Sequence, residues 1–368
     1  MLQYGCFWVS ASRQIPYLYS EETVDKEYLL KKTLHMFAFF ILTVLLSLQI
    51  CSGCSTGRLE FFDETRDMMD TYIRIGVYTE NREKAQEVIN AAFTRIEEIE
   101  LVATIYDSAG EAFQLNETGF LGNPADDLIE MLNYSNEYFD LTGGYFDITV
   151  QPLLDLYTFD PNAEAQFWEL DEETRTARIN EVMNCVGTDR IIIENGTVRL
   201  LEGTKITLGG IAKGYAADEA LKLIAGKGIT SALVDAGGDT KTLGSKPDGS
   251  LWNVTLVNPD DTTEFLADFY VSGMAVMTSG NYERYFSPDK KASHILNPKT
   301  GMSAPGTTSV TIITKSGTMA DALATGVMAM GTEAGLALIE TLDGTEAMII
   351  DQDLNIHKSS GLSKYMNQ

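Results

Sequence analysis

Basic side chains are scarce in this sequence. The 368 residues include 27 Lys and Arg against 53 Asp and Glu, so the formal net charge is −26. Proteins that bind nucleic acids rely on basic surface, and this composition argues against a nucleic-acid partner. An anionic small ligand is still compatible with it, provided that a cation or a helix N-terminus offsets the repulsion.

Cysteine and histidine are also scarce. Only one cysteine falls in the presumed globular part, which excludes a disulfide framework and a cysteine metal cluster. Three histidines are too few and too scattered for a multi-histidine metal site. The residues concerned are Cys6, Cys51, Cys54, Cys185, His35, His294 and His357.

Standard phosphate-binding and hydrolase motifs are missing. The stretch ITLGGIAKGYAADEALKLIAGKGI, residues 206–229, predicts a short strand, a glycine-rich turn and a helix. A P-loop has Lys after its last glycine, but here Lys213 precedes Gly214, and no G-x-G-x-x-G spacing occurs. Two interpretations stay open from this stretch alone, an anion site at a helix N-terminus or a plain strand–turn–helix. No G-x-S-x-G or H-E-x-x-H occurs, so a serine hydrolase or zinc protease has no support.

The N-terminal region is typical of a secretory signal. Two lysines precede an apolar core, residues 37–50, that is short for a membrane span and ends in small residues before Cys54. This pattern resembles a bacterial lipobox, in which Cys54 carries the lipid, although Cys51 stands where leucine is usual. An ordinary signal peptide or an uncleaved anchor is the alternative.

Residues 1–29 fit no part of a signal segment, and we expect an over-extended gene start. Residues 1–53 are therefore treated as a leader region, outside the fold. The predicted domain covers residues 58–365.

Hydrophobic periodicity predicts an α+β fold with mostly antiparallel sheets and helices layered on them. Strands occur both in hairpins, as around Asn195-Gly196, and in alternation with helices. The predicted strands cover 71–78, 190–200, 206–208, 231–236, 250–257, 265–271 and 309–314, with a closing strand at 345–351. The predicted helices cover 81–104, 125–142, 212–226, 318–330 and 333–342.

Four polar stretches with tight turns are candidates for chemistry: 142–147, 234–244, 278–301 and 320–326. Taken singly, each also has a structural interpretation: a helix stop with core aromatics, a β-turn, a structural histidine, and a chance helical pair. Within them, His294 suits general-base chemistry. Asp321 and Thr325 lie four residues apart on one helix face, where carboxylate, hydroxyl and carbonyl oxygens suit Mg²⁺ or Ca²⁺.

Taken together and in order, these segments resemble the FAD:protein FMN transferase family, also called the ApbE family. The resemblance covers roughly residues 68–350 and rests on MMDTYIRI, YDSAGEAFQLN, TGGYFDITVQPLLDLY, VGTDRI, LGGIAKGYAAD, DAGGD, TSGNYERYF, SHILNPKTG and MADALATG. It implies an ApbE-like, T-fold-like architecture. It also implies that the glycine turn faces the pyrophosphate and flavin of FAD.

The resemblance implies an enzyme that uses Mg²⁺ and transfers FMN from FAD to a Thr or Ser hydroxyl of an acceptor protein, through a phosphoester bond, with release of AMP. Acceptors in the family are typically redox-pump subunits or secreted flavoproteins, and a lipid-anchored, extracytoplasmic location is common. One alternative is an FAD pyrophosphatase that yields FMN and AMP, and another is a non-enzymatic flavin-binding lipoprotein.

Carried over by motif, the resemblance assigns His294 as the catalytic base near the acceptor hydroxyl. The Mg²⁺ ligands it implies are Asp321, Thr325 and the backbone carbonyl of Ala212. The residues it places around FAD are Met69, Tyr145, Phe146, Asp147, Gly209, Lys213, Asp239, Ser279 and Ile295.

The sequence departs from the family pattern around the ligand more than at the metal. The departures are Asp70 for the usual glycine, Thr207, Asn281 and Asn297 for usual aspartates, and a degraded segment at 106–113. Because the implied metal ligands and His294 are intact, we expect activity, with FAD contacts and acceptor choice most affected.

Overall fold

A computed structural model describes residues 31–37, 58–258, 264–282, 285–287, 292–304 and 306–366. The chain divides into two units, Met1–Gly57 and Arg58–Gln368. In the first, residues 31–37 form an exposed helix. Within the described residues, no helix combines the length and apolarity needed to cross a membrane. Apart from that helix, the predicted leader and Cys54 lie outside the described residues, and the proposed boundaries of the domain stay predictions.

The second unit is built on an eight-stranded sheet with the order β1-β2-β6-β7-β10-β11-β12-β13. Neighbouring strands in this order pair antiparallel. The strands are β1 (Glu60–Met68), β2 (Thr71–Thr79), β6 (Ala232–Ala236), β7 (Asp239–Leu243), β10 (Ala275–Gly280), β11 (Thr307–Thr314), β12 (Glu346–Asp351) and β13 (Ile356–Lys358).

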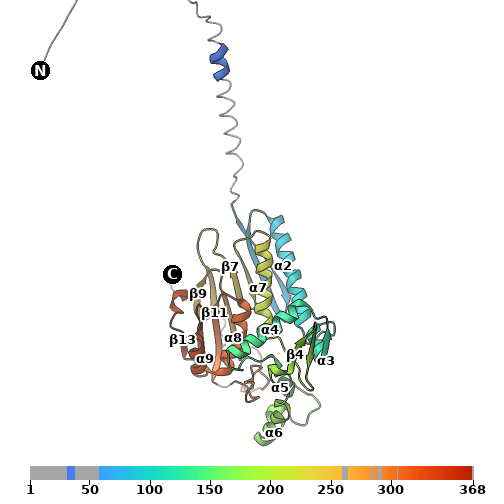
Figure 1. Cartoon of the computed structure of the whole chain (residues 1–368). Coiled ribbons are helices and arrows are strands. Elements are labelled where there is room, and N and C mark those ends of the chain that lie inside the picture. Colours follow the sequence, from blue (N-terminus) through green and yellow to red (C-terminus); the bar gives the residue numbers. More distant parts are fainter. Residues whose placement is uncertain are drawn as a thin grey trace, which may run out of the picture. The chain divides into compact units, whose positions relative to one another are not determined.

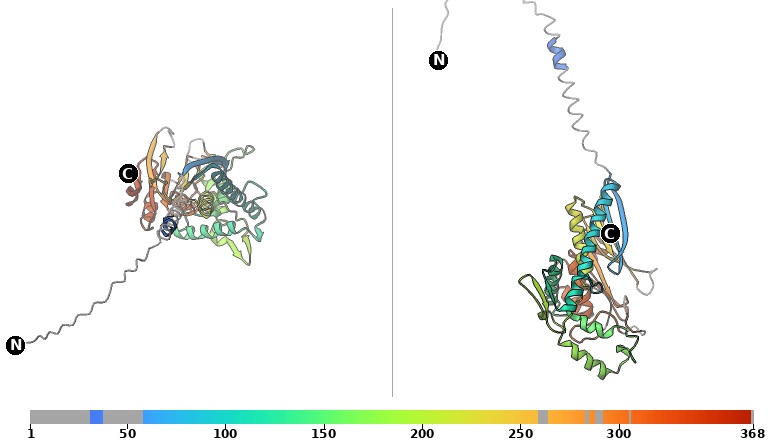
Figure 2. Two further views of the ribbon diagram at one scale, coloured as in Figure 1. Left: turned by 90° about the horizontal axis from the view of Figure 1, so that it is seen from above. Right: turned by 90° about the vertical axis from the view of Figure 1, so that its right-hand side faces the viewer.

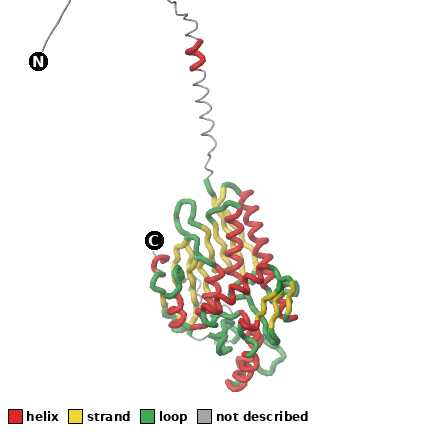
Figure 3. Tube along the Cα trace, viewed as in Figure 1, coloured by secondary structure: helices red, strands yellow, loops and turns green. Residues whose placement is uncertain are grey.

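Helices cover one face of this sheet (Figures 1 and 3). Their apolar side chains and those of the strands form the main core, to which Phe93, Leu132, Ala220 and Leu323 belong. The helices are α2 (Arg82–Ala103), α4 (Asp126–Leu141), α7 (Ala212–Gly226), α8 (Gly317–Met330) and α9 (Thr332–Ile339). Figure 2 shows α2 and α7 to one side of the β1–β2 hairpin.

Alternation along the strands explains why both faces of the sheet are covered. On β12, Ala347 and Ile349 belong to the main core, whereas Met348 and Ile350 belong to a second core on the opposite face. The period of two in a strand produces this division. The second core is closed by a hairpin, β8 (Trp252–Val257) and β9 (Phe265–Val271), and is flanked by α10 (Ser363–Met366).

Two smaller parts complete the second unit. A three-stranded sheet consists of β3 (Phe120–Gly122), β5 (Thr197–Leu200) and β4 (Ile191–Glu194), next to α3 (Glu111–Thr118). A third apolar cluster joins α5 (Gln151–Tyr157) and α6 (Glu172–Met183) to Leu296 and Phe286. This cluster packs Phe286, Ala292 and Leu296 against α5 and α6.

The predicted α+β class with antiparallel sheets is confirmed, but one predicted strand is wrong. Residues 206–208 form no strand. Their backbone groups form hydrogen bonds outside any sheet. Asn116 Oδ1 accepts the Ile206 N–H, Asn116 Nδ2 donates to Ile206 O, and the Thr207 N–H donates to Ile148 O. Because these partners satisfy the hydrogen-bonding groups of the backbone, this apolar stretch does not have to pair with a neighbouring strand.

Candidate functional site

Helices α7 and α8 carry four of the predicted site residues near their mutual crossing. α7 begins at Ala212, directly after the glycine turn, and its Gly214 N–H donates to Asp321 Oδ2 of α8 at 2.9 Å. Asp321 is only 5% exposed. A carboxylate in this position satisfies a helix N–H that has no intrahelical partner and lies at the positive end of the helix dipole.

Glycine permits the close approach of the two helices. A Cβ on Gly214 would lie 2.8 Å from Asp321 Cβ and would overlap the carbonyl of Gly317. A Cβ on Gly210, in the preceding turn, would lie 3.0 Å from Thr325 Oγ1 and 3.3 Å from Phe146 Cε2. The glycine turn therefore brings bare backbone against Thr325.

Lys213 forms an ion pair with Asp239, the first residue of β7. The other oxygen of Asp239 accepts the Thr278 N–H of β10 at 2.7 Å. One residue further along β10, Ser279 Oγ lies 3.2 Å from Thr325 Oγ1. These contacts connect the glycine turn, two central strands and α8, although the residues are far apart in the sequence.

The tip of the β1–β2 hairpin lies beside the DAGGD turn. Met69 and Asp70 both have positive φ, 54° and 58°, which matches a type I′ turn that glycine would occupy more readily. The Met69 N–H donates to Glu100 Oε1 at 2.6 Å. The Gly237 N–H donates to Tyr72 O at 2.9 Å, and a Cβ added to Gly237 would lie 3.2 Å from Thr71 Cβ.

Of two carboxylates near these turns, Asp147 is buried and Asp235 is half-buried. Burial raises the pKa of Asp147, although hydrogen bonds from the N–H and hydroxyl of Thr149 oppose the shift. Burial likewise raises the pKa of Asp235, and the nearby charge of Asp239 adds to it, whereas the Gly238 N–H opposes it. The flanks of the site therefore disfavour further negative charge unless a cation is present.

The TGGYFD segment contributes both aromatic and polar groups. Phe146 is buried, with its N–H donating to Thr142 Oγ1 at 2.9 Å. Tyr145 is half-buried, and Lys299 Nζ lies 4.0 Å from the centre of its ring, which is cation–π geometry. A Cβ on Gly326 of α8 would lie 3.1 Å from Phe146 Cβ, so this segment packs closely on α8.

His294 is half-buried in a segment that is fixed on both sides. Ser293 and Ser303 exchange hydrogen bonds of 3.0 Å, and the Ala304 N–H donates to Ile295 O at 2.9 Å. Asn297 Nδ2 donates to Ala329 O near the end of α8 at 3.3 Å. The histidine segment is therefore anchored to the helix that carries Asp321 and Thr325.

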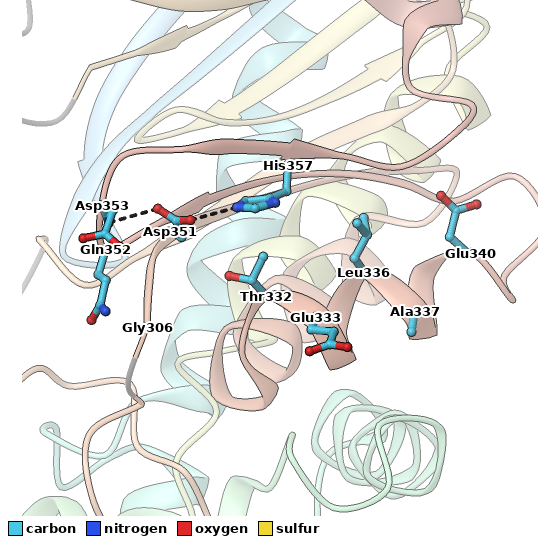
Figure 4. A pocket seen from close by; sticks show the side chains of 10 residues that line it. All are labelled: Gly306, Thr332, Glu333, Leu336, Ala337, Glu340, Asp351, Gln352, Asp353 and His357. Atoms are coloured by element: carbon cyan, nitrogen blue, oxygen red, sulfur yellow. Dashed lines mark hydrogen bonds and ion pairs between the residues drawn. The ribbon is translucent and has the colours of Figure 1, made fainter.

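A separate hollow of about 720 Å³ lies between α9 and the β12–β13 edge (Figure 4). None of the predicted site residues lines it. Its lining consists of Gly306, Thr332, Glu333, Leu336, Ala337, Glu340, Asp351, Gln352, Asp353 and His357. Size alone does not mark a site, and the convergent polar groups lie at the α7–α8 crossing instead.

The contacts above join most of the predicted residues, which the sequence places in separate motifs. Lys213 forms an ion pair with Asp239, and the N–H of the next residue, Gly214, donates to Asp321. The hydroxyl groups of Ser279 and Thr325 are hydrogen-bonded to each other. Met69 and Ile295 pack on the same main core. Gly210, Gly214 and Gly317 were not predicted, because only the three-dimensional crossing shows what a side chain would strike. The roles of the individual residues stay predictions.

Comparisons with known proteins identify the family of the chain. Residues 69–349 match the ApbE family. A Vibrio cholerae FAD:protein FMN transferase is 33% identical over 217 residues, which is 58% of this chain and 64% of that protein. A Treponema pallidum FAD:protein FMN transferase is 29% identical over 339 residues, 85% of this chain and 92% of that protein.

Solved structures show the same fold. The ApbE protein of Thermotoga maritima superposes with a TM-score of 0.74 at 26% identity, covering 84% of this chain and all (100%) of that one. The flavin transferase ApbE of Vibrio cholerae gives a TM-score of 0.71 at 24% identity, with the same coverage. Because the sequence match spans most of the second unit, this chain belongs to the ApbE family.

Proposed function

We propose that this protein is an FAD:protein FMN transferase. Two curated relatives bear that name, and their alignments cover 58% and 85% of the chain. The observation that carries the proposal is the convergence at the α7–α8 crossing. There a bare glycine turn and Lys213 lie at a helix N-terminus, which suits an anionic pyrophosphate, and the adjacent buried Asp321 offers a carboxylate for a cation that would bridge to it.

The residues present fit a magnesium ion. The donor set that the sequence predicts consists of the Asp321 carboxylate, the Thr325 hydroxyl and the Ala212 carbonyl, all hard oxygen ligands. The described residues include no cluster of three or more acidic, histidine or cysteine side chains that would hold a metal by itself. Magnesium commonly binds through one or two carboxylates together with substrate phosphates, so a site with one carboxylate suits this ion. When bound, it would neutralise charge on the pyrophosphate.

His294 is the proposed general base. The acceptor hydroxyl oxygen attacks the phosphorus of the FMN phosphate, and the bond from that phosphorus to the AMP oxygen breaks. The hydroxyl proton passes to the imidazole of His294, and AMP leaves. Since phosphoryl-type transfer is dominated by positioning and charge neutralisation, the anchored segment around His294 would serve to fix the base beside the acceptor.

FAD would lie across the turns that meet at the site. Tyr145 and the Met69 turn offer aromatic and apolar surface for the isoalloxazine ring, and the buried Phe146 would support this segment from within the core. Lys213 offers a cation for the phosphates. Lys213 is paired with Asp239 here, so its reorientation toward the pyrophosphate would exchange one anionic partner for another.

The proposed location is extracytoplasmic, with the protein held at the membrane by lipid on Cys54. The support is the lipobox-like sequence before Cys54. Labelling cells with a fatty-acid analogue tests it: label on the parent chain but absent from a Cys54→Ser variant supports the anchor, and label on neither contradicts it.

The direct test is the intact mass of an acceptor. The chain is incubated with FAD, Mg²⁺ and a secreted or redox-pump protein that bears a Thr or Ser flavinylation motif. A gain of one FMN, lost in His294→Ala and in Asp321→Ala, supports the transferase. Free FMN and AMP with every tested acceptor unmodified would instead indicate a pyrophosphatase, and FAD binding without cleavage would indicate a non-enzymatic flavin-binding protein.

A further inference from the structure

Asp218, a residue of α7 outside the predicted site, holds the start of α8. Its Oδ1 accepts the Gly317 N–H at 2.9 Å. Its Oδ2 accepts the Thr318 N–H and hydroxyl, both at 2.9 Å, and the Ser316 hydroxyl at 3.0 Å. Two of the N–H groups that a helix leaves without intrahelical partners are therefore satisfied from another helix.

The two helices exchange carboxylates. Asp218 of α7 binds the N-terminal end of α8, and Asp321 of α8 binds the Gly214 N–H in the first turn of α7. Each carboxylate lies at the positive end of the other helix's dipole. Between them the backbones of Gly214 and Gly317 touch, which leaves little room for either helix to shift.

Lys241 of β7 ties this exchange to the sheet. Its Nζ lies 4.0 Å from Asp218 Oδ1, donates to Gly273 O at 3.3 Å, and donates to Lys315 O just before α8. The ammonium group offsets the charge of Asp218 and holds the chain that leads into α8. Strand, first helix and second helix are thereby joined at one point.

We propose that Asp218 is a positioning residue for the divalent-cation site. By fixing where α8 starts on α7, it sets Asp321 and Thr325 relative to the Ala212 carbonyl. Asp321 lies one helical turn after Thr318, so a shift or rotation of the helix start moves its carboxylate directly. Magnesium requires near-ideal octahedral geometry, and even a small displacement lowers affinity. This inference rests on the proposed metal site of the transferase.

The test measures cation binding separately from activity. Mn²⁺ is titrated into the full-length chain and free Mn²⁺ is followed by electron paramagnetic resonance, while FMN transfer at saturating FAD is measured against Mg²⁺ concentration. We expect Asp218→Asn to weaken Mn²⁺ binding and to raise the Mg²⁺ requirement by about tenfold, as loss of a group supporting a metal ligand commonly does. Asp218→Glu, which keeps the carboxylate, should recover part of the affinity.

A matched control separates positioning from general stability. Glu346 is, like Asp218, a carboxylate with several hydrogen-bond partners, accepting from Ser359 Oγ at 2.6 Å and from the Gly361 N–H at 3.1 Å. Glu346→Gln should lower thermal stability and leave Mn²⁺ affinity unchanged. If Asp218→Asn fails to fold, Thr318→Val removes a single hydroxyl bond to Asp218, and it should shift the Mg²⁺ requirement in the same direction by a smaller factor.

The outcomes distinguish this inference from the proposed function. One outcome overturns the positioning role alone: the parent transfers FMN in a metal-dependent way, and folded Asp218→Asn binds Mn²⁺ with unchanged affinity. If Asp218→Asn does not fold, unchanged affinity in Thr318→Val has the same meaning. A parent chain that binds no Mn²⁺ and transfers FMN without Mg²⁺ overturns the proposed metal site and the positioning role with it, and leaves the transferase standing. A parent chain that binds Mn²⁺ but transfers FMN to no tested acceptor overturns the proposed function alone. An equal loss of affinity in Glu346→Gln also overturns the positioning role, because stability would then explain the effect.

Discussion

Two acidic regions of this protein differ in what their carboxylates contact. At the α7–α8 crossing, Asp218 and Asp321 each bind backbone N–H groups of the opposite helix. Beside the hollow near α9, Asp351 instead binds groups of its own turn and the next strand: the Asp353 and Asn355 N–H groups and His357 Nε2 at 2.8 Å. The first arrangement fixes elements distant in sequence, and the second closes a local hairpin.

The comparison shows that neither acidity nor cavity size identifies the site. The hollow is spacious and rich in carboxylates, yet the described contacts of Asp351 serve the β12–β13 turn. The crossing is tightly packed, and its polar groups come from several strands and helices. Convergence of distant segments on carboxylates is the more informative signal, and two pairs of substitutions and one single variant test this comparison.

The largest expected difference is in activity. Asp321→Ala should reduce FMN transfer by about 10²–10³-fold, a typical loss when one group that stabilises developing charge is removed. Asp351→Ala, the matched variant at the hollow, should leave the rate unchanged. Initial rates of acceptor flavinylation measure both. A comparable loss in Asp351→Ala would place the hollow in the catalytic machinery and contradict the comparison.

A second, intermediate effect concerns the packing of α7 on α8, and it is tested at two glycines of α7. Gly214→Ala forces a methyl group against the Gly317 backbone, and overpacking of this kind costs about 1–3 kcal/mol. Gly226→Ala, at the other end of α7, meets open space and should be neutral or stabilising by up to about 1 kcal/mol. Urea denaturation gives both values. Equal free energies of unfolding for the two variants would show that the crossing tolerates separation.

The smallest expected effect is a pH dependence at the hollow. Its hydrogen bond with His357 lowers the pKa of Asp351 from 3.8 to about 2. A carboxyl group whose pKa is depressed in the folded state stabilises the fold above its unfolded pKa, and this contribution is lost as the pH falls through the folded value. The parent chain should therefore exceed Asp351→Asn in melting temperature more at pH 5 than at pH 2. A difference that is constant over this range would contradict the assigned pKa.

Periodic apolar segments allowed much of the fold to be predicted from the sequence. Helices α2, α4 and α8 and strands β2, β11 and β12 are periodic or continuously apolar, and they form where expected. Strand β1 was missed because its sequence, EFFDETRDM, is mostly charged and it pairs on one side only. Strand β7 was missed because DTKTL reads as a polar turn, although β6 and β10 pair with it on both sides.

The candidate site was predicted through motif resemblance more than through local physics. Lys213, Asp239, Asp321 and Thr325 each had a plausible structural interpretation in isolation, and only their order along the chain singled them out. Asp218 lies within the LGGIAKGYAAD motif, but its role was not predicted, because its partners lie 98 to 100 residues away. A helix-start signal at Ser316 is visible in the sequence, but the sequence does not say which residue will bind it.

The exchange of carboxylates also bears on how the protein matures. During synthesis α7 is complete well before the start of α8 emerges, since Asp218 and Gly317 are separated by 99 residues. Until then Asp218 has no helix end to bind and the first turn of α7 lacks its carboxylate. Contacts over such sequence distances form late and cooperatively. A chain that ends before α8, or in which α7 and α8 have not yet packed together, therefore cannot assemble the site. Activity thus requires that folding of the second unit is complete.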